Sequence, residues 1–402
     1  MSDPASPAWS DELPAGADVV VVGAGIVGTA VAARLAAAGA DVCLLERSGP
    51  GAGSSSSGEG NVLASDKLPG PELDLAMRSL VLWQEVGAEA AERIELERKG
   101  GLVVAWDPAQ RDALYALADE QAVAGIAAQH LEGADLAALE PHLTTDLAGA
   151  VFYEDDYQVQ PMHAVRYQLE TAMADGCLMV RDAEVRGWRS RAGDGAALET
   201  TRGSVLAGTA VVNAAGPWAG ELAERLGSSL PVVPRRGHVL VTEPVSLVTA
   251  HKVYEADYVG SIHDAGDGWQ CSGVVETTAS GTMLLGSSRE FVGWSPAPDP
   301  AIVAAIAARA VALFPGLAGV RLMRTYVGFR PATPDRLPAI GWDPEVPRLV
   351  HATGHEGAGI CLSQATAEGV HCLLEGTVPP VSLDAFDPAR FATAGRPRED
   401  QA

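Results

Sequence analysis

The run GAGIVG, residues 23–28, decides the fold of this chain because of the segments that surround it. The four valines before it, at 19–22, form a continuous apolar run, which is typical of a parallel strand buried on both faces. After the run, an Ala-rich helix is expected over 26–38, and Gly39 is suited to end it because glycine tolerates the left-handed conformation. Residues 41–46 form the next predicted strand. This order of elements predicts the first βαβ unit of a dinucleotide-binding domain.

Each glycine of the run has a separate task in binding a phosphate group. Gly23 permits a tight turn, Gly25 lets the backbone approach a pyrophosphate, and Gly28 lets the helix and strand pack closely. Ile26 and Val27 then begin the helix, where free N–H groups and the positive end of the helix dipole favour an anion. A chance glycine-rich turn is the weaker interpretation, because strand and helix are both predicted in the required places.

Glu46 ends the second predicted strand about twenty residues after the glycine run, where such motifs carry an acidic residue. A carboxylate there accepts hydrogen bonds from a ribose hydroxyl. It also argues against a ribose with a 2′-phosphate, because two negative groups would face each other. The motif alone does not separate FAD from NAD.

The composition limits the classes of partner and site. Acidic residues outnumber basic ones 52 to 28, for a formal net charge of −24, whereas nucleic-acid binding needs concentrated Lys and Arg. Nucleic acid is therefore not expected as a partner. The five cysteines are scattered and include no CxxC pair, which favours a reducing compartment and predicts no metal site. No apolar run has the length of a transmembrane segment, and the acidic N-terminal region is unlike a signal peptide, so a cytoplasmic location is expected.

The remaining patterns indicate a second, strand-rich region. Helices are expected at 72–94, 108–124, 301–314 and 359–374, and strands at 101–105, 178–189, 211–213, 238–242 and 282–286. We therefore expect an α/β fold with a Rossmann-like cofactor domain built from discontinuous segments, plus a strand-rich α+β substrate domain. The predicted cofactor domain takes residues 17–90, 146–230 and 325–385, the substrate domain takes 91–145 and 231–324, and the termini, 1–16 and 388–402, are expected to be flexible.

Several further segments resemble the FAD-dependent oxidoreductases of the D-amino acid oxidase, glycine oxidase and sarcosine oxidase family. They span residues 18–375 in the family's order and include 51–58 (GAGSSSSG), 212–218 (VNAAGPW), 231–238 (PVVPRRGH), 328–335 (GFRPATPD) and 354–360 (GHEGAGI). The strings LLGSSRE at 284–290 and HEG at 355–357 are most similar to one branch. That branch contains the flavin subunits of heteromeric dehydrogenases such as hydroxyproline dehydrogenase, opine oxidase and hydrogen cyanide synthase. The resemblance implies FAD as cofactor and a small amine or amino acid as substrate.

The resemblance also implies which residues hold the flavin nucleotide. The serine loop at 51–58 would contact the flavin, the backbone at Val185 would hold adenine, and 214–216 would pack beside the nucleotide. The N–H groups at 357–359 would face the pyrimidine side of the flavin, where negative charge accumulates on reduction. The predicted cofactor residues are Gly23, Gly25, Ile26, Val27, Gly28, Glu46, Arg47, Ser54, Ser55, Ser56, Gly58, Val185, Ala214, Ala215, Gly216, Trp218, Gly357, Ala358, Gly359 and Ile360.

The flavin is expected to be bound non-covalently. Some relatives attach FAD through a cysteine shortly before the arginine motif, but no cysteine lies between Cys271 and Cys361. Others use a histidine near the start of the chain, whereas the first histidine here is His130. Cys361 is expected to be a small packed side chain.

Four residues are candidates for the substrate site. Arg330 occupies the position of the family's substrate-carboxylate arginine, and its planar guanidinium can grip a carboxylate through two parallel hydrogen bonds. A structural ion pair is the alternative. His355 is a candidate to hydrogen-bond flavin or substrate, and equally a histidine satisfied by neighbouring backbone. Tyr254 and Tyr258 are candidates to line the pocket, although aromatic core residues are the favoured interpretation. No base is assigned, because a free amine can give up hydride without one.

Three functions stay open at this point. The first is oxidation of an amine or amino acid, with electrons passed to oxygen or to an electron-acceptor protein subunit. The second is an FAD-dependent 2-hydroxy acid dehydrogenase, which needs a base and would therefore require His355. The third is a non-catalytic flavin subunit that relays electrons, for which Arg330 would be dispensable. A pyridine-nucleotide–disulfide reductase is disfavoured because the chain has neither a second glycine fingerprint nor a redox CxxC.

Overall fold

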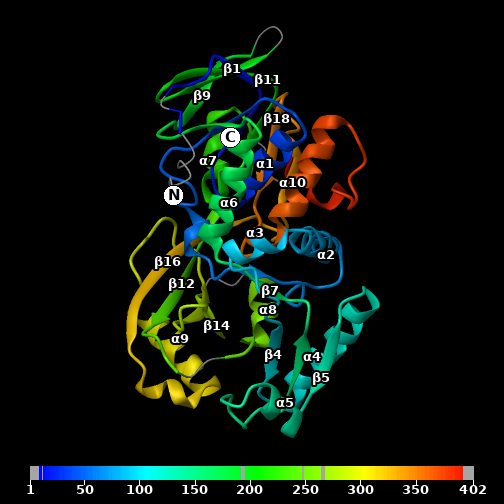
Figure 1. The fold of residues 1–402 in the computed structure, drawn as a ribbon, viewed down its shortest axis with the longest axis vertical. Coiled ribbons are helices and arrows are strands. Elements are labelled where there is room, and N and C mark those ends of the chain that lie inside the picture. The colour runs from blue at the N-terminus through cyan, green and yellow to red at the C-terminus, as the bar shows by residue number, and fades with distance from the viewer. Residues whose placement is uncertain (1–8, 11, 192–194, 247–248, 264–267, 393–402) are drawn as a thin grey trace, which may run out of the picture. The chain divides into compact units, whose positions relative to one another are not determined.

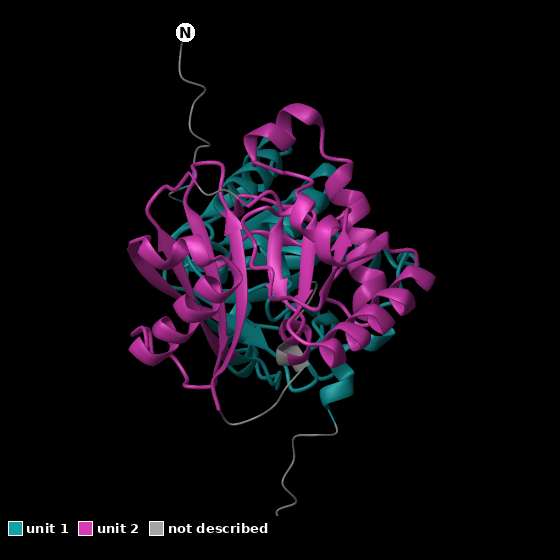
Figure 2. Cartoon of the chain, turned by 90° about the horizontal axis from the view of Figure 1, so that it is seen from below, with its two compact units in different colours: residues 1–56, 162–233, 330–402 teal, residues 57–161, 234–329 magenta. Residues whose placement is uncertain are grey.

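The computed structural model describes residues 9–10, 12–191, 195–246, 249–263 and 268–392 (Figure 1). The chain divides into two compact units, coloured separately in Figure 2. Unit 1 contains residues 1–56, 162–233 and 330–402, and unit 2 contains 57–161 and 234–329. Residues 57–90 and 146–161, which the sequence analysis assigned to the cofactor domain, therefore group with unit 2.

Unit 1 is built on a sheet of eight strands whose main path is β17-β18-β11-β1-β2-β8. Along this path β18, β11, β1, β2 and β8 run parallel, while β17 is antiparallel to β18. The antiparallel strands β10 and β9 extend the sheet beyond β11. The strands are β1 (Gly16–Val22), β2 (Val42–Leu45), β8 (Leu178–Val180), β9 (Val185–Ser190), β10 (Ala196–Thr200), β11 (Gly203–Asn213), β17 (Ala339–Trp342) and β18 (Leu349–Thr353).

The chain order of these strands locates a binding crevice. From β1 the chain passes to β2 and β8 on one side, and it returns to β11 on the other side of β1. In open parallel sheets, ligands bind outside the carboxyl ends of the strands at the point where the order reverses. Here that point lies between the ends of β1 and β11. The expected Rossmann-like α/β architecture is thus confirmed.

Helices of unit 1 cover this sheet (Figure 1). Two of them, α1 and α10, follow the carboxyl ends of β1 and β18. The predicted glycine-turn helix is confirmed as α1, and the predicted last helix as α10, which packs against α1. Gly376 ends α10 in the left-handed conformation, φ 67°. The helices of this unit are α1 (Ile26–Ala37), α6 (Pro161–Ala174), α7 (Ala219–Arg225) and α10 (Gly359–Glu375).

Two expectations for unit 1 differ from the structure. The strand predicted over 178–189 is two strands, β8 and β9, because the backbone turns at Asp182, whose φ is 55°. The terminal segments, expected to be flexible, are partly held in place. Ser10 forms a bridge to Val180, and 388–391 forms a turn in which Arg390 binds Asp335 at 2.7 Å. Residues 1–8, 11 and 393–402 lie outside the described part of the chain.

Unit 2 contains a mostly antiparallel sheet in the order β16-β12-β15-β14-β13-β4-β6-β5, plus a small pair, β3-β7. The strand-rich composition predicted for this region is therefore confirmed. Its strands are β3 (Asn61–Val62), β4 (Gly101–Ala105), β5 (Ala128–Leu131), β6 (Gly149–Tyr153), β7 (Tyr157–Gln158), β12 (Val233–Thr242), β13 (Lys252–Glu255), β14 (Gln270–Thr277), β15 (Met283–Arg289) and β16 (Leu322–Ala332).

The core of unit 2 lies between this sheet and α9, whose Ile302, Ile306 and Leu313 pack with Val275 and Leu285 of the sheet. The helix expected over 72–94 is two helices, because the chain breaks before α3 at Gly87. The helices are α2 (Pro71–Gln84), α3 (Ala88–Arg93), α4 (Pro108–Val123), α5 (Gly133–Leu139), α8 (Asp257–His263) and α9 (Pro300–Leu313). Among the described residues, no helix combines the length and apolarity that crossing a membrane requires.

Candidate active site

The glycine turn between β1 and α1 is packed so closely that two of its positions exclude any side chain. Gly23 has φ +108°, and a Cβ there would overlap the backbone of Ala214 at the end of β11. A Cβ at Gly28 would overlap the carbonyl oxygen of Gly23. These contacts give the first and third glycines the packing tasks that the sequence pattern implied. The turn therefore brings bare backbone to the crevice between β1 and β11.

Glu46 is held at the same turn by two backbone hydrogen bonds. Its Oε2 accepts from the N–H of Ala24 and its Oε1 accepts from the N–H of Ser48, each at 2.8 Å. The carboxylate is thus fixed at the carboxyl end of β2, beside the glycine turn. This is the place from which an acidic side chain can reach a ribose hydroxyl.

The serine loop is bonded to the glycine turn and packs on Trp218. Ser55 Oγ accepts a 3.0 Å hydrogen bond from the N–H of Ile26, and the Gly51 N–H donates to Ala24 O at 2.8 Å. The guanidinium of Arg47 lies 4.2 Å from the centre of the Trp218 ring, and a Cβ at Gly53 would touch the same ring at 3.0 Å. Predicted cofactor residues from three separate segments of unit 1 are therefore brought together. Ser54 and Ser56 belong to this loop, whereas Gly58 belongs to unit 2.

The segment after β11 borders the crevice from the opposite side. The Ala214 N–H donates to Val22 O at 3.0 Å, which joins the ends of β11 and β1. Thr353 Oγ donates to Gly216 O at 3.1 Å, and Asn213 Oδ1 accepts from the Ala215 N–H at 3.3 Å. Val185 begins β9, with its side chain in the apolar core of the unit and its carbonyl accepting from Arg225 at 3.2 Å. Its contact with adenine stays a prediction.

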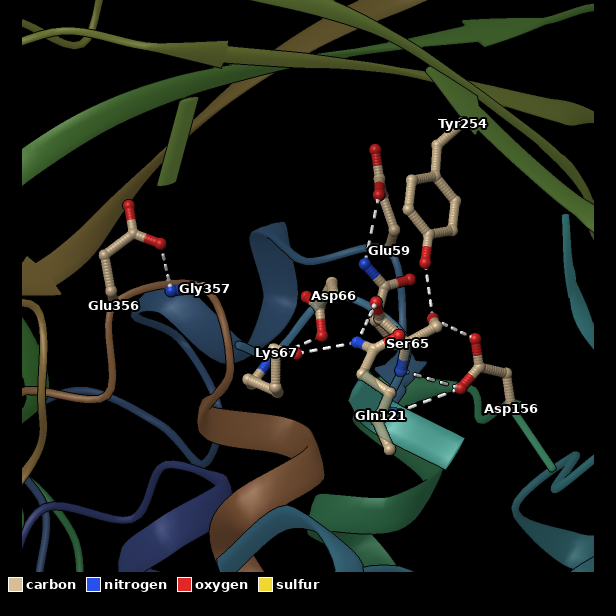
Figure 3. Close-up of polar contacts among 11 residues, drawn as sticks. Glu59, Ser65, Asp66, Lys67, Gln121, Asp156, Tyr254, Glu356 and Gly357 are labelled. Carbon is tan, nitrogen blue, oxygen red and sulfur yellow. Dashed lines mark hydrogen bonds and ion pairs between the residues drawn. The ribbon is translucent and has the colours of Figure 1, made fainter. Parts of the chain in front are cut away.

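The second part of the candidate site is the turn that connects β18 to α10. Arg330, near the end of β16, lies against this turn: a Cβ at Gly357 would be 3.5 Å from Arg330 Nε. The side chain of Arg330 is 20% exposed, and its Nε lies 4.0 Å from Glu356 Oε1. Figure 3 shows the other oxygen of Glu356, Oε2, accepting a 2.5 Å hydrogen bond from the Gly357 N–H. Ala332 and His355 form an antiparallel bridge that fixes the end of β16 beside the turn.

This turn differs from the expectation that the N–H groups of 357–359 form an anion site. The Gly357 N–H is bonded to Glu356, and the Ala358 N–H donates to His355 O at 2.9 Å. The N–H groups of Gly359 and Ile360 begin α10 and have no acceptor within the helix. The predicted anion site therefore depends on these two groups. Glu356, which the sequence analysis passed over, is thus part of the site. The signal that marked it was a carboxylate directly before Gly357, inside a family motif.

His355 is a buried residue of the turn with a side-chain partner of its own. Its Nε2 lies 2.9 Å from Thr366 Oγ1, on α10. Burial lowers the pKa of His355 to about 3, so its ring is neutral at any ordinary working pH. The partner of His355 is thus a side chain on α10 rather than the neighbouring backbone, and its contact with flavin or substrate stays a prediction.

Tyr254 and Tyr258 belong to unit 2, where both side chains are buried. The Tyr254 hydroxyl bonds to Ser65 Oγ, which also binds the carboxylate of Asp156 (Figure 3). Burial raises the pKa of Asp156 to about 7. Tyr258 stacks edge-on against Tyr254 and lies 4.6 Å from the guanidinium of Arg289. Both tyrosines are therefore buried within unit 2, and their contact with substrate stays a prediction.

The cofactor features of unit 1 suit the nucleotide part of FAD. The glycine turn packs closely against the end of β11 without any side chain, and α1 begins directly after it with N–H groups suited to an anion. Glu46 supplies a carboxylate at the ribose position, and Trp218 with Arg47 borders the serine loop. Together these are the elements that a Rossmann-type site uses for a dinucleotide without a 2′-phosphate.

Comparisons with known proteins agree with this geometry. The family model described as "FAD dependent oxidoreductase" (DAO) matches residues 18–371. Glycine oxidase of Geobacillus kaustophilus is 30% identical over 93% of this chain and 96% of that protein, and its crystal structure superposes with a TM-score of 0.84 over 94% of this chain and 99% of that chain. The hydrogen cyanide synthase subunit HcnC of Pseudomonas aeruginosa is 29% identical over 81% of this chain and 75% of that protein.

A further neighbour, L-proline dehydrogenase from P. horikoshii, is 21% identical over 96% of this chain and all of that chain, with a TM-score of 0.84, and shows the fold alone. The family model spans most of the chain and includes both the glycine turn and the turn before α10. The chain therefore belongs to the DAO family of FAD-dependent oxidoreductases and is an enzyme with FAD as its cofactor.

Proposed function

We propose that this enzyme oxidises the C–N bond of a small amino acid, of the D-, N-alkyl or proline type, to the imine. The observation that carries the proposal is Arg330, a partly exposed guanidinium held over the Glu356–Gly357 turn at the start of α10. A guanidinium in a site closed on one side by protein is suited to take a carboxylate through two hydrogen bonds. Arg330 would then hold the substrate while its Cα–H is presented to the flavin.

The division of labour between cofactor and protein follows from this arrangement. FAD would supply the acceptor for the substrate's hydride, which carries both electrons of the oxidation. The residues of the chain bind and orient, and this positioning lowers the entropic part of the barrier. A substrate whose nitrogen is a free amine needs no protein base in the hydride step, and His355 is buried, neutral and bonded to Thr366.

The state of His355 also separates the proposal from a 2-hydroxy acid dehydrogenase. Oxidation of an alcohol requires removal of the hydroxyl proton, so such an enzyme needs a base near the substrate. His355 was the candidate for that role, and its depressed pKa makes it a poor proton acceptor. The relatives support the same choice, since two of them are named as glycine oxidase and as a subunit of hydrogen cyanide synthase.

Three further properties are proposed: the electron acceptor, the attachment of FAD and the cellular compartment. HcnC is named as a subunit, which supports transfer to a protein partner, and the glycine oxidases support transfer to oxygen. We propose that FAD is held without a covalent bond, so that denaturation in acid should release all of it from the polypeptide. The scattered, free cysteines support placement in the cytoplasm.

The decisive experiment is anaerobic mixing of the FAD-loaded enzyme with D-amino acids, N-methyl amino acids, prolines and 2-hydroxy acids. Bleaching of the flavin absorbance by amino acids is the expected result, and repeating the positive case in air separates an oxidase from a dehydrogenase. Bleaching by hydroxy acids alone would show that the proposed C–N chemistry is wrong.

A paired substitution tests the role of Arg330. Arg330→Met should keep FAD but lose at least about 100-fold in kcat/KM, because hydrogen bonds to charged groups are among the strongest that a site offers. Arg324→Met, on the exposed part of the same strand β16, is the matched control and should leave kcat/KM unchanged. Equal activity of Arg330→Met and the parent would instead favour an electron-relay subunit.

A further inference from the structure

Glu356 adopts a backbone conformation that its own residue type disfavours. Its φ is 49°, in the left-handed region where glycine is the default residue, and the turn already has glycines at 354 and 357. Its N–H donates to Pro331 O at 2.9 Å, so the backbone is held in this state by β16. Strained residues persist only where the surrounding structure holds them in place, and they cluster at active and binding sites. The question is therefore what the carboxylate of Glu356 does.

The carboxylate of Glu356 is placed between two groups of the candidate site. Its side chain is only 4% exposed, with Oε2 on the Gly357 N–H and Oε1 at 4.0 Å from Arg330 Nε. The guanidinium that would bind the substrate thus has a buried negative charge as its immediate neighbour. Both groups come from unit 1 and are fixed to each other by the Ala332–His355 bridge.

We propose that Glu356 determines the specificity of this site by selecting zwitterionic amino acids over hydroxy acids and other plain carboxylates. The proposal rests on the proposed function, because it takes Arg330 as the carboxylate-binding group. Glu356 touches Gly357 and lies beside Arg330, and it acts on the ligand through its charge.

The selectivity follows from the sum of charges in a poorly solvated site. Arg330 and Glu356 together are neutral, and an amino acid zwitterion adds no net charge when it binds. Its ammonium group is one carbon from the carboxylate, so it falls within reach of the attraction of Glu356. A hydroxy acid brings one uncompensated negative charge next to Glu356, and a buried unpaired charge is strongly disfavoured. Arg330 and Glu356 together therefore favour binding of the amino acid over binding of its oxygen analogue.

The test uses matched ligands that differ in one atom group. Glycine with glycolate, alanine with lactate, and proline with tetrahydro-2-furoate are titrated anaerobically into the FAD-loaded enzyme, and flavin absorbance gives Kd and the extent of reduction. The parent enzyme should prefer the amine of each pair. In Glu356→Gln the oxygen analogue should bind about 10-fold more tightly and the amino acid about 10-fold more weakly, in line with the effect of one close charge on ionisation equilibria.

A second readout follows the protonation of the bound substrate. A carboxylate beside an ammonium group stabilises the charged form and raises the pKa of the amine, so loss of that carboxylate lowers it. Hydride leaves the Cα only when the neighbouring amine is unprotonated. The acid limb of kcat against pH should therefore move to lower pH, by about one unit, in Glu356→Gln. A residue with only a structural role would lower kcat without moving this limb.

Three further variants make the outcome decisive. Glu356→Gly removes the charge with the residue that the left-handed backbone accepts, and should reproduce the Gln result even if Gln is poorly tolerated. Glu356→Asp keeps the charge and should retain the preference for amines. Glu375→Gln removes an exposed carboxylate from the far end of α10 and should change neither ratio nor pH profile.

The inference would be overturned if Glu356→Gln and Glu356→Gly weaken both members of each pair equally and leave the pH limb in place. In that case reduction of the parent enzyme by amino acids would still support the proposed function. Failure of every amino acid to reduce the parent enzyme would overturn the proposed function itself, and the two failures are thereby distinguished.

Discussion

Two glycine-rich turns of unit 1 lead into long helices, but their polar partners come from different distances along the chain. In the turn at 23–28, the N–H of Ala24 is bonded to Glu46 and that of Ile26 to Ser55, which lie 22 and 29 residues away. This turn is completed by other elements of the fold. It keeps its shape only while β2 and the serine loop stay in place.

In the turn at 354–359, two N–H groups find their acceptors within the turn, while the N–H of Glu356 donates to Pro331 O of β16. The Gly357 N–H is bonded to the side chain of Glu356, and the Ala358 N–H to the carbonyl of His355. The comparison teaches that a glycine pattern marks where a helix begins, whereas the origin of the acceptors decides what the turn can do. Glu46, which is distant from its turn in sequence, can accept a hydrogen bond from a ligand. Glu356, which belongs to its turn, places a carboxylate beside Arg330.

The largest effect should come from filling the first turn. Gly28→Ala puts a methyl group onto the carbonyl oxygen of Gly23, so we expect a loss of about 3 kcal/mol in unfolding free energy, as for overpacked cores. FAD retention, read from the ratio of flavin to protein absorbance, should fall with it. Gly49→Ala is the control, because a Cβ at Gly49 meets nothing within 4 Å. Similar stability of the two variants would show that the turn is not tightly packed.

The second turn, at 354–359, should make the unfolding free energy depend on pH through His355. His355 has a pKa of about 3 in the folded protein and 6.5 as its ordinary value, so the unfolded chain takes up this proton first as the pH falls. The stability associated with the neutral ring is complete above about pH 6.5 and is lost progressively down to about pH 3, and at about pH 5 the loss is about 2 kcal/mol.

His355→Gln removes the titrating group and can keep a hydrogen bond to Thr366. The difference in unfolding free energy between the parent and this variant should therefore change by about 2 kcal/mol between about pH 8 and pH 5 in urea titrations. Asp156, whose raised pKa gives the opposite slope, is present in both proteins and cancels. A pH-independent difference would mean that His355 is accessible to protons, and would revive it as a base.

A smaller effect is expected from the distant carboxylate of the first turn. Glu46→Gln leaves one oxygen to accept from two N–H groups, those of Ala24 and Ser48, and we expect a loss of about 1.5 kcal/mol because a hydrogen bond to a charged group is lost. FAD affinity should fall by about 10-fold, measured by titration of the apoprotein. Unchanged affinity would place the ribose elsewhere.

The smallest effect should separate the serines of the loop. Ser55→Ala removes the acceptor of the Ile26 N–H and should cost about 1 kcal/mol, with a few-fold loss of FAD affinity. Ser56→Ala, at the neighbouring exposed position, should be close to neutral in thermal unfolding. Equal effects of both would indicate that the loop acts as a whole rather than through Ser55.

The elements that sequence reasoning predicted well are those with a physical signal inside the chain itself. The valine run before Gly23, the Ala-rich helix and the acidic end of β2 define a βαβ unit by pattern alone, and the structure follows it to within three residues. The last helix was also recognisable, since the helix predicted over 359–374 is found as α10, Gly359–Glu375.

The elements that were missed depend on local backbone conformation or on tertiary packing. The break between β8 and β9 comes from a left-handed Asp182, a conformation that apolar patterning does not report. The partner of the Tyr254 hydroxyl, Ser65, lies nearly two hundred residues earlier in the chain, and no sequence pattern reports such a contact. Glu356 was passed over because its importance lies in its proximity to Arg330, which no spacing rule contains.

The discontinuity of unit 1 has a consequence for the folding of the enzyme during its synthesis on the ribosome. Its central strand β1 is paired with β11, and β11 in turn with β18, which emerges only after some 300 later residues have been translated. The apolar edge of β11 at 211–213 therefore stays unpaired during synthesis until β18 has been made. Chains halted before residue 330 should be substrates for chaperones and proteases and not flavoproteins.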